Sequence, residues 1–108
     1  MPTYNKLVRD RIPEIIKRDG KTAVTRILSE DEYLKEIKHK LHEEIAEYEE
    51  AAEADGQLEE LADLLELVHA AAAVHGATLA ELEALRAEKA AQRGGFSDRI
   101  YLVEVKDD

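Results

Sequence analysis

Two stretches decide the fold: Leu41-His42-Glu43-Glu44-Ile45-Ala46-Glu47-Tyr48 and, after a short break, Leu58-Glu59-Glu60-Leu61-Ala62-Asp63-Leu64-Leu65. In each, apolar residues recur at steps of three and four, which is typical of an amphipathic α-helix. Each stretch also holds two acidic residues three positions apart along the apolar stripe, namely Glu44 with Glu47 and Glu60 with Asp63. Two such helices joined by a tight turn are expected to gather carboxylates beside a hydrophobic core.

The neighbouring residues predict where these helices begin and end. Ser29 and Glu32 form a capping-box pattern, so the first helix is expected to run from there to about Ala54. Asp55-Gly56 is expected to break the chain, and a second helix is expected over about 57–75.

Outside the hairpin, Pro13 favours a short helix to about Arg18, and Thr78 with Glu81 predicts another helix to about Arg93. Segments 22–28 and 100–105 are rich in β-branched residues and are predicted to be short strands that pair with each other. The expected fold is therefore mainly α, a helical bundle with a short two-stranded β element. The small Ala-rich faces and the wide apolar arc of the second helix also predict association into a dimer or a larger assembly.

Length and composition limit the class of protein. The 108 residues suit one domain, 1–108, and the absence of Cys excludes disulfides and thiolate chemistry. No apolar run approaches the roughly 20 residues that span a membrane, so a soluble, cytoplasmic protein without a membrane partner is expected.

The net charge of −10 is unevenly distributed. Residues 1–28 carry a net +4, residues 29–66 a net −12, and residues 67–108 a net −2. An acidic surface disfavours a nucleic-acid polymer as partner. The acidic middle segment contains both carboxylate pairs, so a bound cation is expected there.

The carboxylate pairs predict a metal site. In a hairpin centred near 55–56, the two pairs lie about one helical turn, roughly 6 Å, out of register, which Glu and Asp side chains can bridge. Hard oxygen ligands without Cys favour Mg²⁺ or Mn²⁺, and Mg²⁺ commonly binds substrate phosphates. The alternative is a solvated acidic face, because this composition gives about five or six acidic pairs at this spacing by chance. Glu49, Glu50 and Glu53 are interpreted in that way.

The pattern Glu43-Glu44-x-x-Glu47, twelve residues, Glu60-x-x-Asp63 resembles the signature of the MazG-like all-α NTP pyrophosphatases. This superfamily is related to phosphoribosyl-ATP pyrophosphohydrolase and the dimeric dUTPases. The opening Tyr4-Asn-Lys-Leu-Val-Arg-Asp-Arg-Ile-Pro-Glu-Ile-Ile16 and Arg93-Gly-Gly-Phe96 are similar to a subgroup described as phosphoribosyl-ATP pyrophosphohydrolase-like or house-cleaning NTP pyrophosphatases. The similarity covers nearly the whole chain.

The resemblance implies Mg²⁺-dependent cleavage of a nucleoside triphosphate between its α and β phosphates. Its motif implies four metal ligands: Glu44, Glu47, Glu60 and Asp63. It also makes Glu43, Glu44 and Glu47 the candidate catalytic carboxylates, with Glu43 as a base or as a carboxylate that supports the ligands.

Basic side chains must balance the remaining phosphate charge. The candidates are Lys6 and Arg9 in the basic opening, Lys40 three residues before Glu43, and Arg93 beside Gly94-Gly95. For each, the alternative is an ordinary surface cation. Two other functions stay open: phosphoribosyl-ATP hydrolysis in histidine biosynthesis, and a non-catalytic helical module that binds metal or nucleotide.

Overall fold

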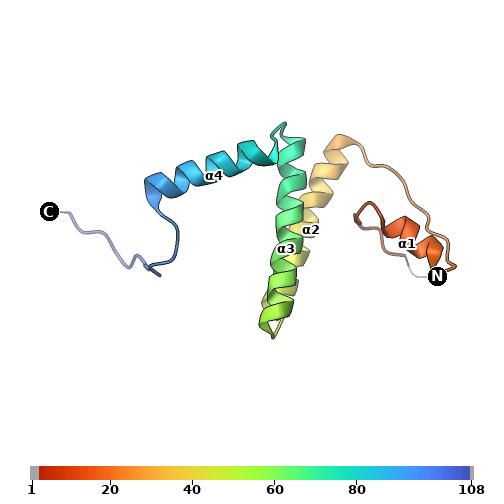
Figure 1. Cartoon of the computed structure of the whole chain (residues 1–108), viewed down its shortest axis with the longest axis horizontal. Helices are drawn as coiled ribbons and strands as arrows, with labels where there is room; N and C mark the ends of the chain where they lie inside the picture. Colours follow the sequence, from red (N-terminus) through yellow and green to blue (C-terminus); the bar gives the residue numbers. More distant parts are fainter. Residues whose placement is uncertain (1–2, 108) are drawn as a thin grey trace.

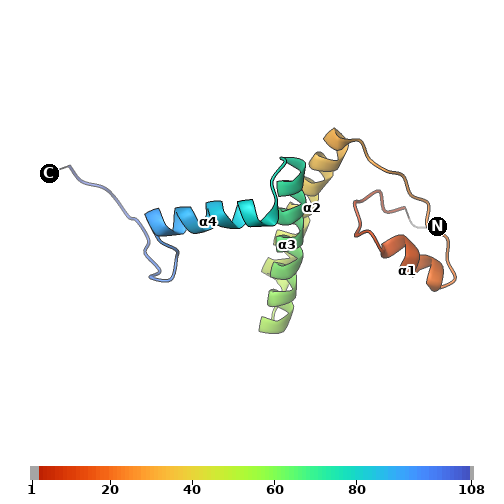
Figure 2. The ribbon, with the colours of Figure 1, turned by 45° about the horizontal axis from the view of Figure 1, so that its top comes forward.

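A helical hairpin organises the chain. The computed structural model describes residues 3–107 and places in them α1 (Ile12–Arg18), α2 (Glu30–Glu50), α3 (Ala54–Val74) and α4 (Leu79–Arg93). Helices α2 and α3 lie side by side along their length, α1 is set apart from this hairpin on the side of the N-terminus, and α4 leaves the end of α3 at a steep angle (Figures 1 and 2). The predicted helical fold class is confirmed.

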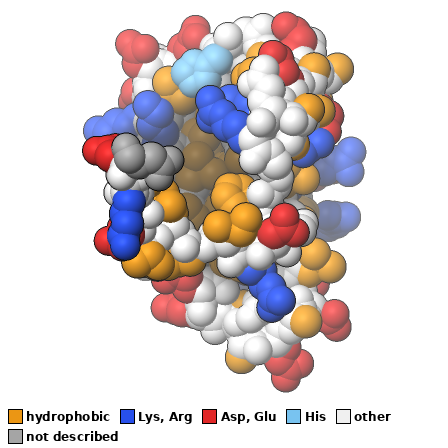
Figure 3. All heavy atoms as spheres, turned by 90° about the vertical axis from the view of Figure 1, so that its left-hand side faces the viewer, with side chains coloured by type: hydrophobic (Ala, Val, Ile, Leu, Met, Phe, Trp, Pro, Cys, Tyr) orange, Lys and Arg blue, Asp and Glu red, His pale blue; other side chains and the backbone are white. Residues whose placement is uncertain are grey.

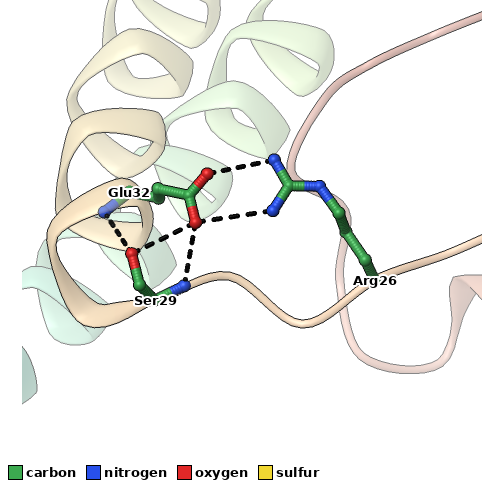
Figure 4. Close-up of polar contacts among 3 residues, drawn as sticks. All are labelled: Arg26, Ser29 and Glu32. Carbon is green, nitrogen blue, oxygen red and sulfur yellow. Dashed lines mark hydrogen bonds and ion pairs between the residues drawn. The ribbon is translucent and has the colours of Figure 1, made fainter.

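The capping box at Ser29 is confirmed and forms the start of α2. The Glu32 backbone N–H donates to Ser29 Oγ at 3.3 Å, and the Ser29 backbone N–H donates to Glu32 Oε1 at 3.2 Å. The guanidinium of Arg26 adds two hydrogen bonds to the same carboxylate, at 3.0 and 3.4 Å (Figure 4). These donors hold the pKa of Glu32 down at about 2. The start of α2 is therefore fixed by local contacts alone.

The connection from α3 to α4 also follows the sequence prediction. Helix α3 ends before Gly76, whose φ of +82° lies in the left-handed region that glycine adopts most readily. Thr78 and Glu81 then form the second predicted capping box, which begins α4. Gly94, with φ +82°, follows the last residue of α4.

The predicted break at Asp55-Gly56 is wrong by a few residues. The chain leaves the helical conformation at Ala51, and α3 already begins at Ala54, so both residues lie in its first turn. The Gln57 side chain donates to the Ala51 carbonyl at 2.9 Å and so satisfies a C-terminal carbonyl of α2. The shorter turn changes the register of the hairpin, with consequences for the carboxylates.

The predicted two-stranded β element is not seen in residues 3–107. Segment 22–28 connects α1 to α2, whereas segment 100–105 follows α4 at the opposite end of a molecule 68 Å long (Figure 1). Paired strands lie about 4.8 Å apart, so α4, which points away from the hairpin, keeps the two segments from meeting within one chain.

The core of the single chain is small. Among the described residues, the buried apolar side chains are Ile37 of α2 and Ala72 of α3. Leu34, Leu41, Leu64 and Leu67 are half-buried around them. One chain thus supplies an open hairpin with two side elements rather than a closed bundle. Within residues 3–107 no helix combines the length and apolarity that crossing a bilayer requires.

Candidate metal centre

Three of the predicted ligands come together between α2 and α3. Glu44, Glu47 and Glu60 each offer one carboxylate oxygen, and these oxygens all lie within 4.8 Å of one another. The short turn explains this, because Glu44 lies eight residues before Ala52 and Glu60 lies eight residues after it. The two side chains are therefore level with each other, and Glu47 reaches the same place from the next turn of α2.

Burial makes this cluster different from a solvated acidic face. Glu44 is 8% exposed, Glu60 is half-buried, and Glu47 is exposed. Oε2 of Glu44 and Oε2 of Glu60 are inaccessible to solvent and accept no hydrogen bond from any described residue. Leaving a buried acceptor unpaired costs on the order of 1–3 kcal/mol, and more for a charged group. The cluster therefore requires either protons or a cation.

The raised pKa of Glu44 also indicates that the cluster needs a proton or a cation. Burial, together with the neighbouring carboxyl groups of Glu60, Glu47 and Asp63, raises this pKa to about 7. At neutral pH this carboxyl group is thus partly protonated, and a divalent cation would compete with that proton.

The geometry suits a small hard cation. Ligand oxygens on opposite sides of an octahedral Mg²⁺ are about 4.2 Å apart, since each lies about 2.1 Å from the ion. Adjacent ligand oxygens around the same ion are about 3.0 Å apart. The three oxygens lie within 4.8 Å of one another, so side-chain rotations that shorten these distances would bring them around one ion. Glu47 and Asp63 are accessible enough to leave room for water or a phosphate group.

The fourth predicted ligand, Asp63, already has a cationic partner. Arg9 Nη2 lies 2.6 Å from Asp63 Oδ1, and Arg9 Nη1 lies 3.9 Å from Oε1 of Glu66. The fold thus brings a predicted phosphate-binding residue to the edge of the carboxylate cluster, across 54 positions of sequence. The sequence prediction missed Glu66, although it continues the three-residue spacing of Glu60 and Asp63.

Lys6, Lys40 and Glu43 meet at a neighbouring place. They line a hollow of about 30 Å³ between the N-terminal segment and α2. The Lys6 ammonium also lies 5.5 Å from the centre of the Tyr4 ring. Glu43 therefore lines a hollow of mixed charge, which Glu36 also lines, although Glu43 is adjacent to Glu44 in sequence.

Arg93 is not brought to the site within one chain. It lies at the far end of α4, where it lines a hollow of about 190 Å³ with Gly94, Phe96 and their neighbours. Helix α4 points away from the hairpin in both ribbon views (Figures 1 and 2). The basic residues predicted for the substrate are thus divided between the N-terminal segment, α2 and this distant end.

Comparison with known proteins gives one similarity. The chain is 52% identical over 54 residues to an uncharacterised protein of Mycolicibacterium smegmatis. The aligned part is 50% of this chain and 55% of that relative, so the chain spans about half the length of the curated relative it matches. No protein-family model and no solved structure matches the chain.

Proposed function

We propose that this chain is a Mg²⁺-dependent nucleoside triphosphate pyrophosphohydrolase of the MazG-like class, with Mn²⁺ as an alternative ion. The observation that carries the proposal is the buried, unpartnered carboxylate of Glu44 within a cluster that includes Glu47 and Glu60. Asp63, at the edge of this cluster, completes the ligand set that the sequence resemblance implies. A carboxylate cluster that is buried at Glu44 and open to solvent at Glu47, with Arg9 at its edge, suits a metal-bound polyphosphate better than a solvated surface does.

In the proposed reaction, water attacks the α-phosphorus, the bond to the α,β-bridging oxygen breaks, and pyrophosphate leaves. A bound Mg²⁺ supplies neutralisation of phosphate charge and a lower pKa for a coordinated water. The buried Glu44, the half-buried Glu60 and the exposed Glu47 would hold the ion. Glu43 takes the proton of the attacking water.

The basic residues bind the substrate in this proposal. Lys6 and Lys40 line the hollow next to Glu43, so they are placed to balance the charge of the phosphate chain. Arg9 exchanges its ion pair with Asp63 for a phosphate oxygen when the metal and nucleotide bind. The physiological role that we propose is removal of non-canonical nucleotides from the cytoplasmic pool.

We also propose that the functional unit is a homodimer or homotetramer. The exposed apolar residues of α3 include Leu58, Leu61, Leu65 and Val68. They recur at steps of three, four and three, the spacing of a helix seam that packs against another helix. A second hairpin on this seam would complete the bundle that one chain leaves open.

A nucleotide panel tests the activity directly. The protein is incubated with Mg²⁺ and ribo-, deoxyribo- and modified-base triphosphates, together with phosphoribosyl-ATP, and the products are separated. Monophosphate with pyrophosphate is expected, together with loss of turnover in Glu47→Gln and Asp63→Asn. The matched control Glu50→Gln changes an exposed carboxylate on the same helix and should leave turnover unchanged.

Four outcomes would contradict the proposal or redirect it. Release of orthophosphate alone, or full activity of Glu47→Gln, would remove the assigned chemistry. Preference for phosphoribosyl-ATP would favour the biosynthetic reaction. Stoichiometric binding without turnover would favour a non-catalytic metal or nucleotide sensor.

A further inference from the structure

The surface of the single chain is too large for a self-contained domain. It exposes 9979 Å², whereas a compact monomer of 12.2 kDa is expected to expose about 6,100 Å². Its radius of gyration is 18.6 Å, against about 13 Å for a compact domain of this length. The excess of about 3,900 Å² per chain is larger than the roughly 1,000–2,500 Å² that each partner buries in an obligate interface of about 2,000–5,000 Å² in total. Contacts with other copies of the chain would therefore supply a large part of the missing burial.

Two extended segments account for much of the exposed apolar surface. In segment 22–28, Val24 and Ile27 are each 96% exposed. In segment 100–105, the five apolar side chains are 74–89% exposed. Figure 3, viewed from the end of the molecule that carries the C-terminal segment, shows hydrophobic side chains exposed on this face. Both segments have β-rich sequences and unpaired backbone, a combination that favours pairing with another strand.

The shape of the chain separates these segments. Segment 22–28 runs from the end of α1 to the start of α2, and segment 100–105 lies beyond the outer end of α4 (Figures 1 and 2). The 15-residue α4, about 22 Å long, carries the C-terminal segment away from its own hairpin. An arm that projects in this way can reach a neighbouring molecule.

We propose that the occupant of both segments is a second copy of the chain. Segment 100–105 of one copy pairs as a β-strand with segment 22–28 of the other, and the exchange is reciprocal, as two-fold symmetry requires. The pairing gives each segment hydrogen-bond partners along one edge of its backbone and brings apolar side chains of the two segments into contact. It does not depend on the chemistry at the carboxylate cluster.

One consequence concerns Arg93. The exchange places the end of α4 on the side of the second copy where segment 22–28 and the N-terminal segment with Lys6 and Arg9 lie (Figure 1). Arg93, which is remote from the cluster of its own chain, is then carried toward the basic residues of the second copy. This last step rests on the proposed function, whereas the strand exchange does not.

Cysteine cross-linking tests the exchange with the full chain, because the protein has no Cys of its own. Val24→Cys is co-expressed, in a differently tagged chain, with single Cys substitutions at each position from 100 to 105. Strand pairing predicts a strong disulfide between the two tagged chains at the tail position opposite Val24 and weak ones elsewhere, since a disulfide needs Cα atoms within about 7 Å and adjacent side chains point to opposite faces. Lys89→Cys on α4, paired with Val24→Cys, is the control for chance collisions.

Light scattering on the wild-type chain should give twice the chain mass or a larger multiple. Val103→Pro should abolish the cross-link while the helical circular-dichroism signal persists, because proline removes a strand donor. A chain carrying Cys at both 24 and 103 that forms only intrachain disulfides would overturn the proposal. A monomer mass, or equal cross-linking at all six tail positions and at residue 89, would also overturn it. None of these readouts involves nucleotide, so they fail or succeed separately from the proposed activity.

Discussion

Replacing Glu44 by Gln should stabilise the metal-free protein while abolishing its response to Mg²⁺. The carboxyl group of Glu44 is 8% exposed, and its pKa is raised from 4.5 to about 7, chiefly by burial. Because of that difference, the ionised Glu44 lowers the free energy of unfolding of the native protein by about 3 kcal/mol. Gln keeps the shape of the side chain and carries no charge, so the variant avoids this cost.

The gain in stability of Glu44→Gln over the wild type should increase with pH. Because the folded pKa is raised, the cost is absent below about pH 4.5, grows as the pH rises, and is complete above about pH 7. The gain in Glu44→Gln should therefore be about 3 kcal/mol at pH 8 and about half of that at pH 5.5. Urea denaturation of the wild type and the variant at both pH values measures it.

With Mg²⁺ present, the wild type should become more stable than Glu44→Gln. A bound cation stabilises the native wild type by mass action, and the variant lacks a ligand for it. The control Glu50→Gln should show neither the gain nor the loss, because its carboxylate is exposed on the same helix. The reasoning is refuted if Glu44→Gln is destabilised without metal, if its gain is equal at pH 5.5 and 8, or if it still responds to Mg²⁺ like the wild type.

The remaining predictions concern the caps, the core and the Arg9 contact. Ser29→Ala should lower the free energy of unfolding by about 1 kcal/mol in urea titrations, since it removes the cap of α2. The lowered pKa of Glu32 means that its contribution to stability is complete above about pH 4.5 and is lost as the pH falls toward 2, which acid titration followed by circular dichroism will show. Ile37→Ala should cost about 3 kcal/mol, measured by thermal unfolding, because it empties a fully buried position. Arg9→Ala should bind Mg²⁺ more tightly in calorimetry without nucleotide, because Asp63 loses its competing cation; unchanged affinity would contradict that competition.

The local features of the fold could be predicted because each depends on residues close in sequence. Both capping boxes join positions three apart, and Gly76 ends α3 by its own backbone conformation. The turn of the hairpin was misplaced because Asp55-Gly56 has strong turn propensity, yet both residues are accommodated in the first turn of α3. Packing of one helix on the other outweighs such a weak local preference.

By itself, the sequence determined the helices, the paired spacing of the acidic residues and the basic character of the N-terminal segment, since these follow from periodicity and composition. Tertiary structure alone decided which carboxylates meet: the shorter turn sets Glu44 level with Glu60, and burial raises the pKa of Glu44. It also decided that Arg9 pairs with Asp63 and that Arg93 lies far away.

The direction of α4 separates segments 22–28 and 100–105, although their composition predicts that they pair. Spacing along a chain fixes neighbours on one helix, whereas distance, burial and partnership between elements depend on how the helices turn and pack.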